Sequence, residues 1–333
     1  MSDAPPPIRH IASARIVAVR GRDLEVREDR VVAEEPLEIR AAGPRQDPVA
    51  VAVTMRTPGH ENELAVGFLR TEGLIDGTEI RNVAFGDPGH LSAPDDTVIV
   101  RLNRAFDASK VAERHFVATA SCGICGKASL DEIAVRCDPI PGGQLVPRTV
   151  ILALPDRMRA AQIAFESTGG LHASALFTLE GELVVLREDV GRHNALDKVV
   201  GSQVLARALP LSERILMVSG RVSFEIVQKA AVAGIPIVCA ISAPSSLAID
   251  AAERLGVTLV GFLRGDGFNI YAHDGRIDLA DLRDAPLAAA SPVTPPGRPV
   301  PKPRPLGEHR ATAGIATALL PKDGKQDRTR DRR

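Results

Sequence analysis

The stretch RILMVSGRVSFEIVQKAAVAGIPIVCAI, residues 214–241, holds a strand, a loop, a helix and a second strand in succession. The apolar run that begins at Arg214 predicts a buried strand, and the apolar spacing from Val222 to Ala233 predicts a helix that ends at Gly234. A second apolar run follows immediately. Because a strand that returns through a helix lies parallel to the first, this stretch predicts an α/β sheet.

The same alternation continues on both sides of this unit. Helices are predicted at 158–167, from 194 and at 244–255, and strands at 183–186, 257–262 and 268–271. We therefore expect residues 149–280 to form an α/β domain, with a mainly parallel sheet and helices on both faces.

The first part of the chain has a different pattern. Short Val/Ile runs separated by charged residues predict strands up to Met55, residues 61–70 predict a helix, and residues 97–102 predict a further strand. We expect a smaller, β-rich N-terminal domain over residues 13–120. Residues 1–12 are expected to be disordered.

Charge is distributed unevenly over the 333 residues. The formal net charge is −1, but the segment from Arg298 onward holds ten Lys/Arg and four Asp/Glu, an excess of six, so the rest carries −7. An acidic body without Trp and with one Tyr lacks the basic stripe and stacking platforms of nucleic-acid binding. The Pro/Arg-rich segment 286–333 is expected to be a disordered tail.

Membrane insertion and export are not expected either. No apolar run approaches the roughly 18 to 20 residues that cross a bilayer. The N-terminal sequence lacks the charged start and apolar region of a signal peptide. We expect a cytoplasmic protein without a nucleic-acid or membrane partner.

Half of the cysteines stand in the sequence SCGICG at 121–126. A glycine beside each sulfur lets the backbone turn freely, and a C-x-x-C setting often lowers the pKa of a thiol. We expect residues 121–148 to form a mobile loop and linker, with Cys122 and Cys125 as the catalytic residues.

Three kinds of chemistry fit this cysteine pair. Structural zinc would need Cys137 and Cys239 as further ligands, but these are isolated, and Cys239 lies in an apolar strand typical of buried thiols. A dithiol redox site is the second interpretation. The third is a thiolate that accepts sulfane sulfur as a persulfide. A zinc deaminase is excluded, because no His or Cys has Glu two positions later.

Polar loops follow three of the predicted strands in the second half, at 188–194, 219–223 and 264–267. Ligands of open α/β sheets bind at the carboxyl ends of strands, where helix N-termini favour phosphate. Arg221 offers a forked donor, and His193 a hydrogen bond to ligand. Each loop alone is equally compatible with an ordinary capped turn, but three together favour one extended phosphate-bearing ligand. His172 is interpreted as a buried histidine rather than a catalytic one.

These segments, taken together, resemble the formate dehydrogenase accessory sulfurtransferase family. The resemblance extends in order over roughly residues 15–275 and rests on six segments: TPGHENELAVGFLRTEG at 57–73, SCGICG at 121–126, TGGLHA at 168–173, REDVGRHNALDK at 187–198, SGRVSFE at 219–225 and GFLR at 261–264.

The resemblance implies a cytoplasmic sulfur carrier. Such a protein would take sulfur from a cysteine desulfurase as a persulfide on Cys122, assisted by Cys125. It would pass the sulfur to the molybdenum (or tungsten) bis-molybdopterin guanine dinucleotide cofactor before insertion into formate dehydrogenase. The resemblance further implies a cytidine-deaminase-like α/β fold, a homodimer, no metal site of its own, and a cofactor-binding stretch of Phe262, Leu263, Arg264, Gly265, Asp266 and Gly267.

Overall fold

The computed structural model describes residues 10–86, 96–112 and 137–282. The strands are β1 (Ile11–Arg20), β2 (Asp23–Val32), β3 (Glu35–Ala42), β4 (Val49–Arg56), β5 (Ile80–Phe85), β6 (Thr97–Leu102), β7 (Val146–Pro147), β8 (His172–Thr178), β9 (Leu183–Asp189), β10 (Arg214–Val218), β11 (Ile237–Ala240), β12 (Thr258–Arg264), β13 (Gly267–Ala272) and β14 (Ile277–Asp278). The helices are α1 (Glu61–Thr71), α2 (Ser109–Ala112), α4 (Arg148–Ala161), α5 (Ile163–Thr168), α6 (Arg192–Leu205), α7 (Phe224–Ala233), α8 (Ser246–Leu255), η2 (Asp274–Arg276) and η3 (Ala280–Leu282).

A six-stranded sheet in the order β13-β12-β11-β10-β8-β9 forms the centre of the α/β part, which confirms the expected fold class. Strands β10, β11 and β12 run parallel, because helices α7 and α8 connect them. The remaining neighbours pair antiparallel. The sheet is therefore mixed and not mainly parallel as expected. Tight turns join β8 to β9 and β12 to β13, and such short connections allow only antiparallel pairing.

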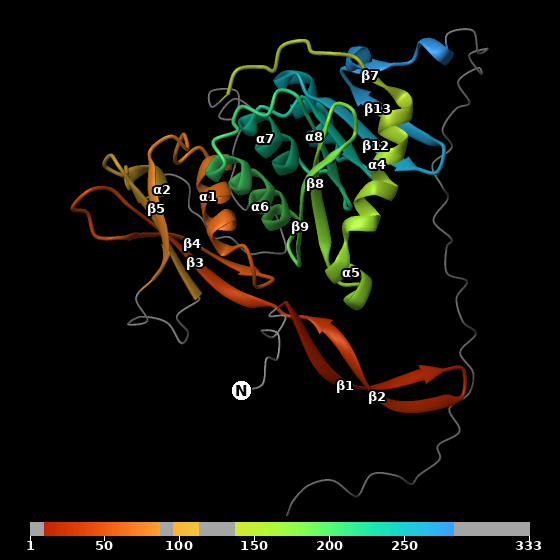
Figure 1. Cartoon of the computed structure of the whole chain (residues 1–333), viewed down its shortest axis with the longest axis horizontal. Coiled ribbons are helices and arrows are strands. Elements are labelled where there is room, and N and C mark those ends of the chain that lie inside the picture. The colour runs from red at the N-terminus through yellow and green to blue at the C-terminus, as the bar shows by residue number, and fades with distance from the viewer. Residues whose placement is uncertain (1–9, 87–95, 113–136, 283–333) are drawn as a thin grey trace, which may run out of the picture. The chain divides into compact units, whose positions relative to one another are not determined.

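Helices cover both faces of this sheet, as expected (Figure 1). Successive residues of β10 point to opposite faces: Met217 packs with Ile151 of α4, whereas Leu216 packs on the side of α6 and α7. Alternate residues of β11 divide in the same way. A strand with apolar residues on both faces must lie in the interior, which explains the continuous apolar runs in the sequence.

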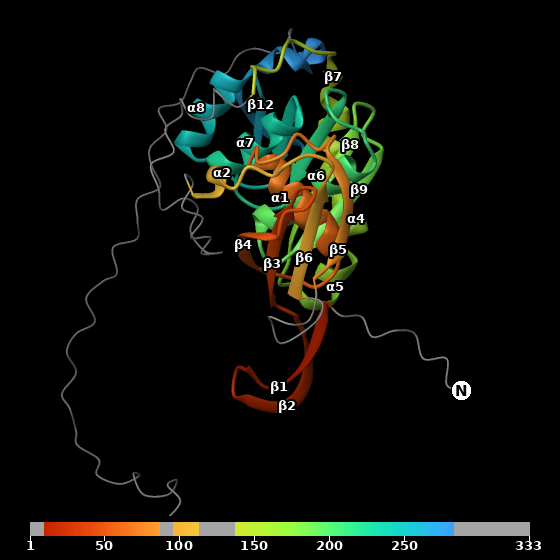
Figure 2. The ribbon, with the colours of Figure 1, turned by 90° about the vertical axis from the view of Figure 1, so that its left-hand side faces the viewer.

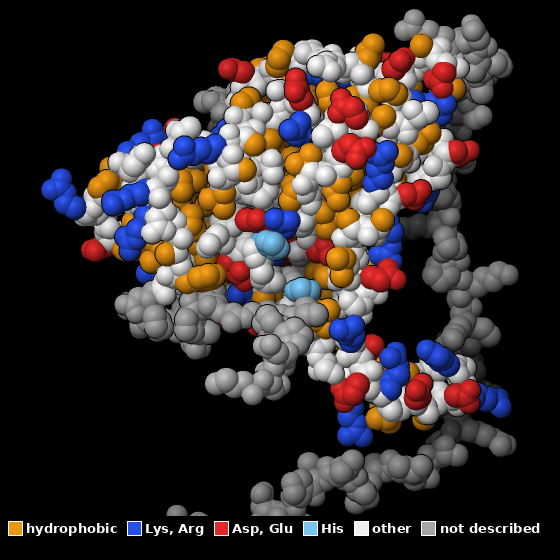
Figure 3. Space-filling view, in the orientation of Figure 1, with side chains coloured by type: hydrophobic (Ala, Val, Ile, Leu, Met, Phe, Trp, Pro, Cys, Tyr) orange, Lys and Arg blue, Asp and Glu red, His pale blue; other side chains and the backbone are white. Residues whose placement is uncertain are grey.

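The N-terminal part contains a four-stranded sheet in the order β4-β3-β6-β5, with α1 against one face. Strands β1 and β2 form a separate antiparallel hairpin that begins at Ile11, two residues before the expected ordered part. Charged side chains of both signs lie on this hairpin (Figure 3), and its apolar residues Val19, Leu24 and Val26 are exposed as well. Buried residues of the ranges 13–120 and 149–280 share one apolar cluster. The division of the chain into two separately folding domains at these bounds stays a prediction.

Two helices occupy the region where one was predicted at 158–167. Helix α4 begins at Arg148, because Pro155 is accommodated inside the helix instead of preceding it. Gln162, with φ −83° and ψ 73°, then separates α4 from α5. No helix in the described part of the chain is long and apolar enough to cross a membrane.

Helices α1 and α6 pack closely against each other, and both views show them side by side (Figures 1 and 2). Glycine lies at the contact on each helix. A Cβ on Gly67 would overlap the backbone carbonyl of Asp197, and a Cβ on Gly201 would overlap that of Glu63. The two backbones therefore touch, and each of these positions requires a residue without a side chain.

Replacing Gly67 by Ala should lower the free energy of unfolding by about 1–3 kcal/mol, because the added methyl group meets rigid backbone. Urea denaturation monitored by circular dichroism measures this. Gly275→Ala is the matched control, since a Cβ there meets nothing within 4 Å. Equal stability of the two variants would contradict the close crossing.

Candidate ligand-binding site

The predicted polar loops meet at one edge of the six-stranded sheet. Strands β9, β10, β11 and β12 all end at this edge, and β8 begins there. Hydrogen bonds join neighbouring loops: Ala173 N–H donates to Ser219 Oγ (2.9 Å), Ser245 N–H to Val222 O (3.0 Å) and Phe262 N–H to Ser242 O (3.1 Å). Four strand-to-strand steps of about 4.8 Å give the row a length of roughly 19 Å.

Three helices begin at this edge, and two of them lack a side-chain cap. Ser245 Oγ accepts a hydrogen bond from Ala248 N–H at the start of α8. Gly191 at the start of α6 and Ser223 at the start of α7 make no such bond. The first N–H groups of α6 and α7 therefore keep their partial positive charge for an anion.

The charged triplet at the end of β9 is anchored inside the protein. Arg187 forms a bidentate pair with Glu63 of α1 (2.6 and 2.7 Å). Glu188 accepts hydrogen bonds from two backbone N–H groups at the start of α5. Asp189 is fully buried and lies 2.6 Å from Lys198 Nζ. This triplet, which the sequence grouped with the ligand loops, positions the loop instead.

The residues that follow the triplet carry the charges facing the edge. Arg192 and His193 begin α6, and Arg221 is exposed after β10. Within the described residues, the buried Nε of Arg192 has no hydrogen-bond acceptor. Cations beside uncapped helix N-termini make this edge suited to an anionic ligand.

His193 lies between two residues of the α7 N-terminus. Its Nε2 is 2.6 Å from Glu225 Oε2 and 3.3 Å from Ser223 Oγ. Both contacts use the same ring nitrogen, so this arrangement is not a hydrolytic triad, in which acid and hydroxyl bind opposite nitrogens. Burial would raise the pKa of Glu225, but the hydrogen bond from His193 and the positive charges of His193, Lys229 and Arg192 together outweigh burial and lower it.

His172 lies at the first position of β8, opposite Asp189 in the strand register. A Cβ on Gly220 would come within 3.3 Å of its Nδ1, so the loop after β10 passes close to the ring. Burial lowers the pKa of His172, and the positive charges of Arg192, His193 and Arg221 lower it further. The sequence predicted a buried histidine, and the structure shows a half-buried one beside positively charged side chains.

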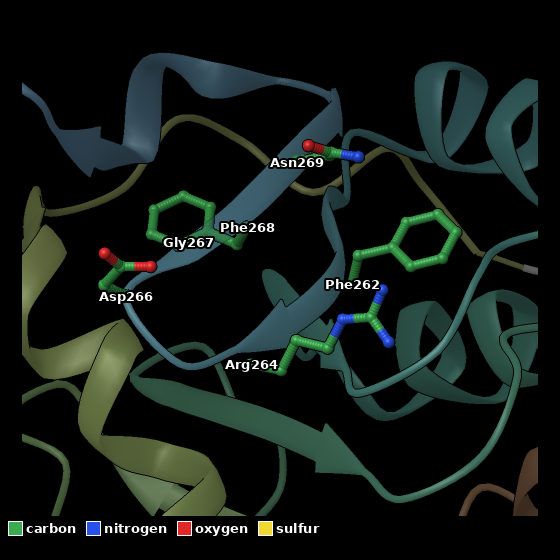
Figure 4. A pocket seen from close by; sticks show the side chains of 6 residues that line it. All are labelled: Phe262, Arg264, Asp266, Gly267, Phe268 and Asn269. Atoms are coloured by element: carbon green, nitrogen blue, oxygen red, sulfur yellow. The ribbon is translucent and has the colours of Figure 1, made fainter.

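The hairpin formed by β12 and β13 closes the other end of the row (Figure 4). Its side chains line an open concavity of ≈ 520 Å³: Phe262, Arg264, Asp266, Gly267, Phe268 and Asn269. The Arg264 guanidinium lies 5.6 Å from the centre of the Phe262 ring, and both side chains point to the same side. Phe262 has φ 53° at an irregularity in the β12–β13 pairing, which turns its ring outward.

The structure thus distributes the predicted ligand residues over one edge. His193 and Arg221 lie beside the α6 and α7 N-termini, and Phe262, Arg264, Asp266 and Gly267 lie at the hairpin. Gly265, with φ +60°, makes the turn between the two strands. Leu263 is fully buried in the apolar cluster against α4, so it could reach a ligand only through its backbone.

The predicted catalytic cysteines, Cys122 and Cys125, lie outside the described residues. The other two cysteines pack on opposite faces of the central sheet, Cys137 against the α7 side and Cys239 among the α4-side residues. Burial raises the pKa of both thiols. A single ion could not take both as ligands, so this arrangement is incompatible with a zinc site built on all four cysteines.

The sequence analysis assigned no role to three residues that contact the ligand loops, although each lies in one of the six segments. Thr57 and Glu225 contact residues of the 188–194 loop from other parts of the chain, and Lys198 contacts Asp189 from within α6. A lysine within the apolar face of a predicted helix was the available signal, because a buried lysine needs an acidic partner.

Comparisons with known proteins agree over most of the chain. The sequence model of the FdhD/NarQ family matches residues 32–278. The "Sulfur carrier protein FdhD" of Streptomyces avermitilis is 47% identical over 273 residues, covering 80% of this chain and 95% of that protein. The protein of the same name from Sulfurisphaera tokodaii is 45% identical over 269 residues, covering 80% and 99%.

A solved structure shares the fold. The crystal structure described as a formate dehydrogenase accessory protein from Desulfotalea psychrophila superimposes with a TM-score of 0.61 at 26% sequence identity. The alignment covers 80% of this chain and 99% of that chain.

The cationic edge predicts an unusual titration of His172. In NMR of histidine-labelled protein, its midpoint should lie below the usual 6.5, and Arg192→Gln should raise it. The neutral ring then contributes stability above pH 6.5, which is lost as pH falls through the lowered pKa. Arg264→Gln, at the hairpin, should leave the midpoint unchanged. A midpoint at or above 6.5 in the unmodified protein would contradict the arrangement.

Proposed function

Because this chain belongs to the FdhD/NarQ family, whose sequence model matches residues 32–278, we propose that it carries sulfur as a persulfide on Cys122. The acceptor is the molybdenum bis-molybdopterin guanine dinucleotide cofactor of a formate dehydrogenase, and the donor is a cysteine desulfurase. The sulfur-carrier role rests on relatives of that name at 45–47% identity.

The sulfur chemistry consists of two thiol exchanges. The Cys122 thiolate attacks the terminal sulfur of the donor persulfide, the donor S–S bond breaks, and the donor leaves as a thiolate. The Cys125 thiolate then attacks Cys122 Sγ and releases hydrosulfide toward the acceptor. The resulting Cys122–Cys125 disulfide is reduced by a cellular dithiol before the next cycle.

One observation favours a guanine dinucleotide cofactor over other sulfur acceptors. Two uncapped helix N-termini lie at the same sheet edge as Arg192 and Arg221. Such a place suits the pyrophosphate of a guanine dinucleotide. At the other end of the row, Phe262 and Arg264 offer a ring and a guanidinium plane against which a base can stack. The row of roughly 19 Å suits an extended ligand rather than a single small anion.

Sulfur loading is tested by mass spectrometry after incubation with a cysteine desulfurase and cysteine. We expect a gain of about 32 Da on Cys122, corresponding to one sulfur atom. Cys137 is an internal control, because its raised pKa leaves little thiolate. Cys122→Ala should fold and lose the adduct.

Two other outcomes would identify the alternative functions. Absence of any sulfur adduct on Cys122 in a Cys125→Ala variant, together with a Cys122–Cys125 disulfide in the unmodified protein, would indicate a dithiol oxidoreductase, because that variant cannot release the sulfur through the second exchange. Stoichiometric zinc in the freshly purified protein, together with loss of structure in Cys122→Ala, would indicate a zinc-stabilised cofactor chaperone.

Ligand binding is tested with GDP by calorimetry. Arg221→Ala and Arg264→Ala should each weaken binding by about tenfold or more, because each loses a charged contact to the ligand. Arg101→Ala, an exposed position on β6 of the four-stranded sheet, should bind as the unmodified protein does. Affinities that do not distinguish these variants would remove the sheet edge from the site.

A further inference from the structure

Two adjacent residues of α6 form separate buried ion pairs. Lys198 Nζ lies 2.6 Å from Asp189 Oδ2, and Asp197 Oδ2 lies 2.9 Å from Lys229 Nζ. All four side chains are buried. The attraction within a buried pair often does no more than balance the cost of removing both charges from water. Stability alone is therefore a weak explanation for either pair.

The Lys198–Asp189 pair closes a network around Thr57. Lys198 Nζ donates to Thr57 O (2.8 Å), and Thr57 N–H donates to Asp189 Oδ2 (3.2 Å). The two residues after Asp189 are held by the same groups. Val190 N–H donates to Thr57 Oγ1 (3.0 Å), and Gly191 N–H donates to Asp189 Oδ1 (2.8 Å).

These bonds determine the direction of the chain as it enters α6. The N–H groups of residues 190 and 191 turn inward, toward Thr57 and Asp189. The next residues, Arg192 and His193, begin the helix, where backbone N–H groups have no partner within the helix. From this geometry we infer that the Lys198–Asp189 pair is a positioning device for the ligand site, fixing the α6 N-terminus and Arg192 toward the anion. The inference rests on the proposed function.

The second pair differs in what it contacts. Lys229 Nζ bonds to Thr71 Oγ1 (2.9 Å) and Glu72 Oε1 (3.0 Å), at the end of α1. None of these described contacts reaches residues 189–193. The two pairs are thus alike in chemistry and burial, but only the first is hydrogen-bonded to the ligand loop, whereas Lys229 acts on the site through its charge, which helps to lower the pKa of Glu225. The second pair is therefore the control for the hydrogen bonds of the first.

The test compares two matched double variants of the full chain. Lys198→Met with Asp189→Asn removes the charges of the first pair, and Lys229→Met with Asp197→Asn removes those of the second. Removing both partners together avoids leaving a lone buried charge, so both proteins are expected to fold. The single variants Lys198→Met and Lys229→Met complete the set.

Two measurements separate positioning from stability. Hydrogen exchange, measured without ligand, should speed up at Val190 and Gly191, whose N–H groups are bonded to Thr57 and Asp189, in the Lys198 variants and remain unchanged there in the Lys229 variants. GDP affinity should fall by about tenfold in the Lys198 variants, as when an oriented donor to phosphate is lost, and by less than about twofold in the Lys229 variants.

The outcomes are distinguishable. Faster exchange at Val190 and Gly191 with weaker GDP binding, confined to the Lys198 variants, supports the inference. Unchanged exchange in those variants, or an equal change in both sets, overturns it. Faster exchange with unchanged GDP affinity also overturns it, because the loop would then not serve the ligand. Failure of the unmodified protein to bind GDP counts against the proposed function, and the exchange data still decide whether this pair fixes the loop.

Discussion

The contact between α1 and α6 is the constraint on which the described structure depends. Gly67 and Gly201 bring the two backbones together without intervening side chains. On one side of this contact Arg187 pairs with Glu63, and on another Asp197 bonds to Thr71. The N-terminal part of the chain and the α/β part therefore share one interior, and the entry into α6 takes its position from both.

Polar groups at the sheet edge have two separate uses. Those bonded inward, such as Glu188 and Asp189, are acidic and satisfy backbone N–H groups or a buried lysine. Those left outward are mainly Arg192, Arg221 and the histidines. Because Glu188 and Asp189 are bonded inward, the edge beside α6 and α7 is locally cationic on a chain whose body is acidic overall, and the exposed acidic residue Asp266 lies at the hairpin end of the row. An anionic ligand is attracted to such an edge without any large basic patch.

The segment that bears the predicted catalytic cysteines is joined to a fixed point on its C-terminal side. Ile140 N–H donates to Leu255 O (2.9 Å), and Arg276 donates to Pro141 O (2.6 Å). The described chain that follows these cysteines is therefore held at α8 and η2.

The sequence alone determined the α/β class, most of the elements of the second half and the loops that form the candidate site. These follow from local rules: apolar periodicity, glycine at helix ends and polar residues after strands. It could not show that the sheet is mixed, that α4 continues through Pro155, or that Leu263 is buried. Which charges face inward depends on the three-dimensional arrangement, because packing between segments brings Thr57 to Asp189 and Glu225 to His193, and the folding of α6 back against β9 brings Lys198 to Asp189. A charged residue is the same in the sequence whether it is paired inside the protein or faces a ligand. Only its neighbours in the folded structure distinguish these two roles.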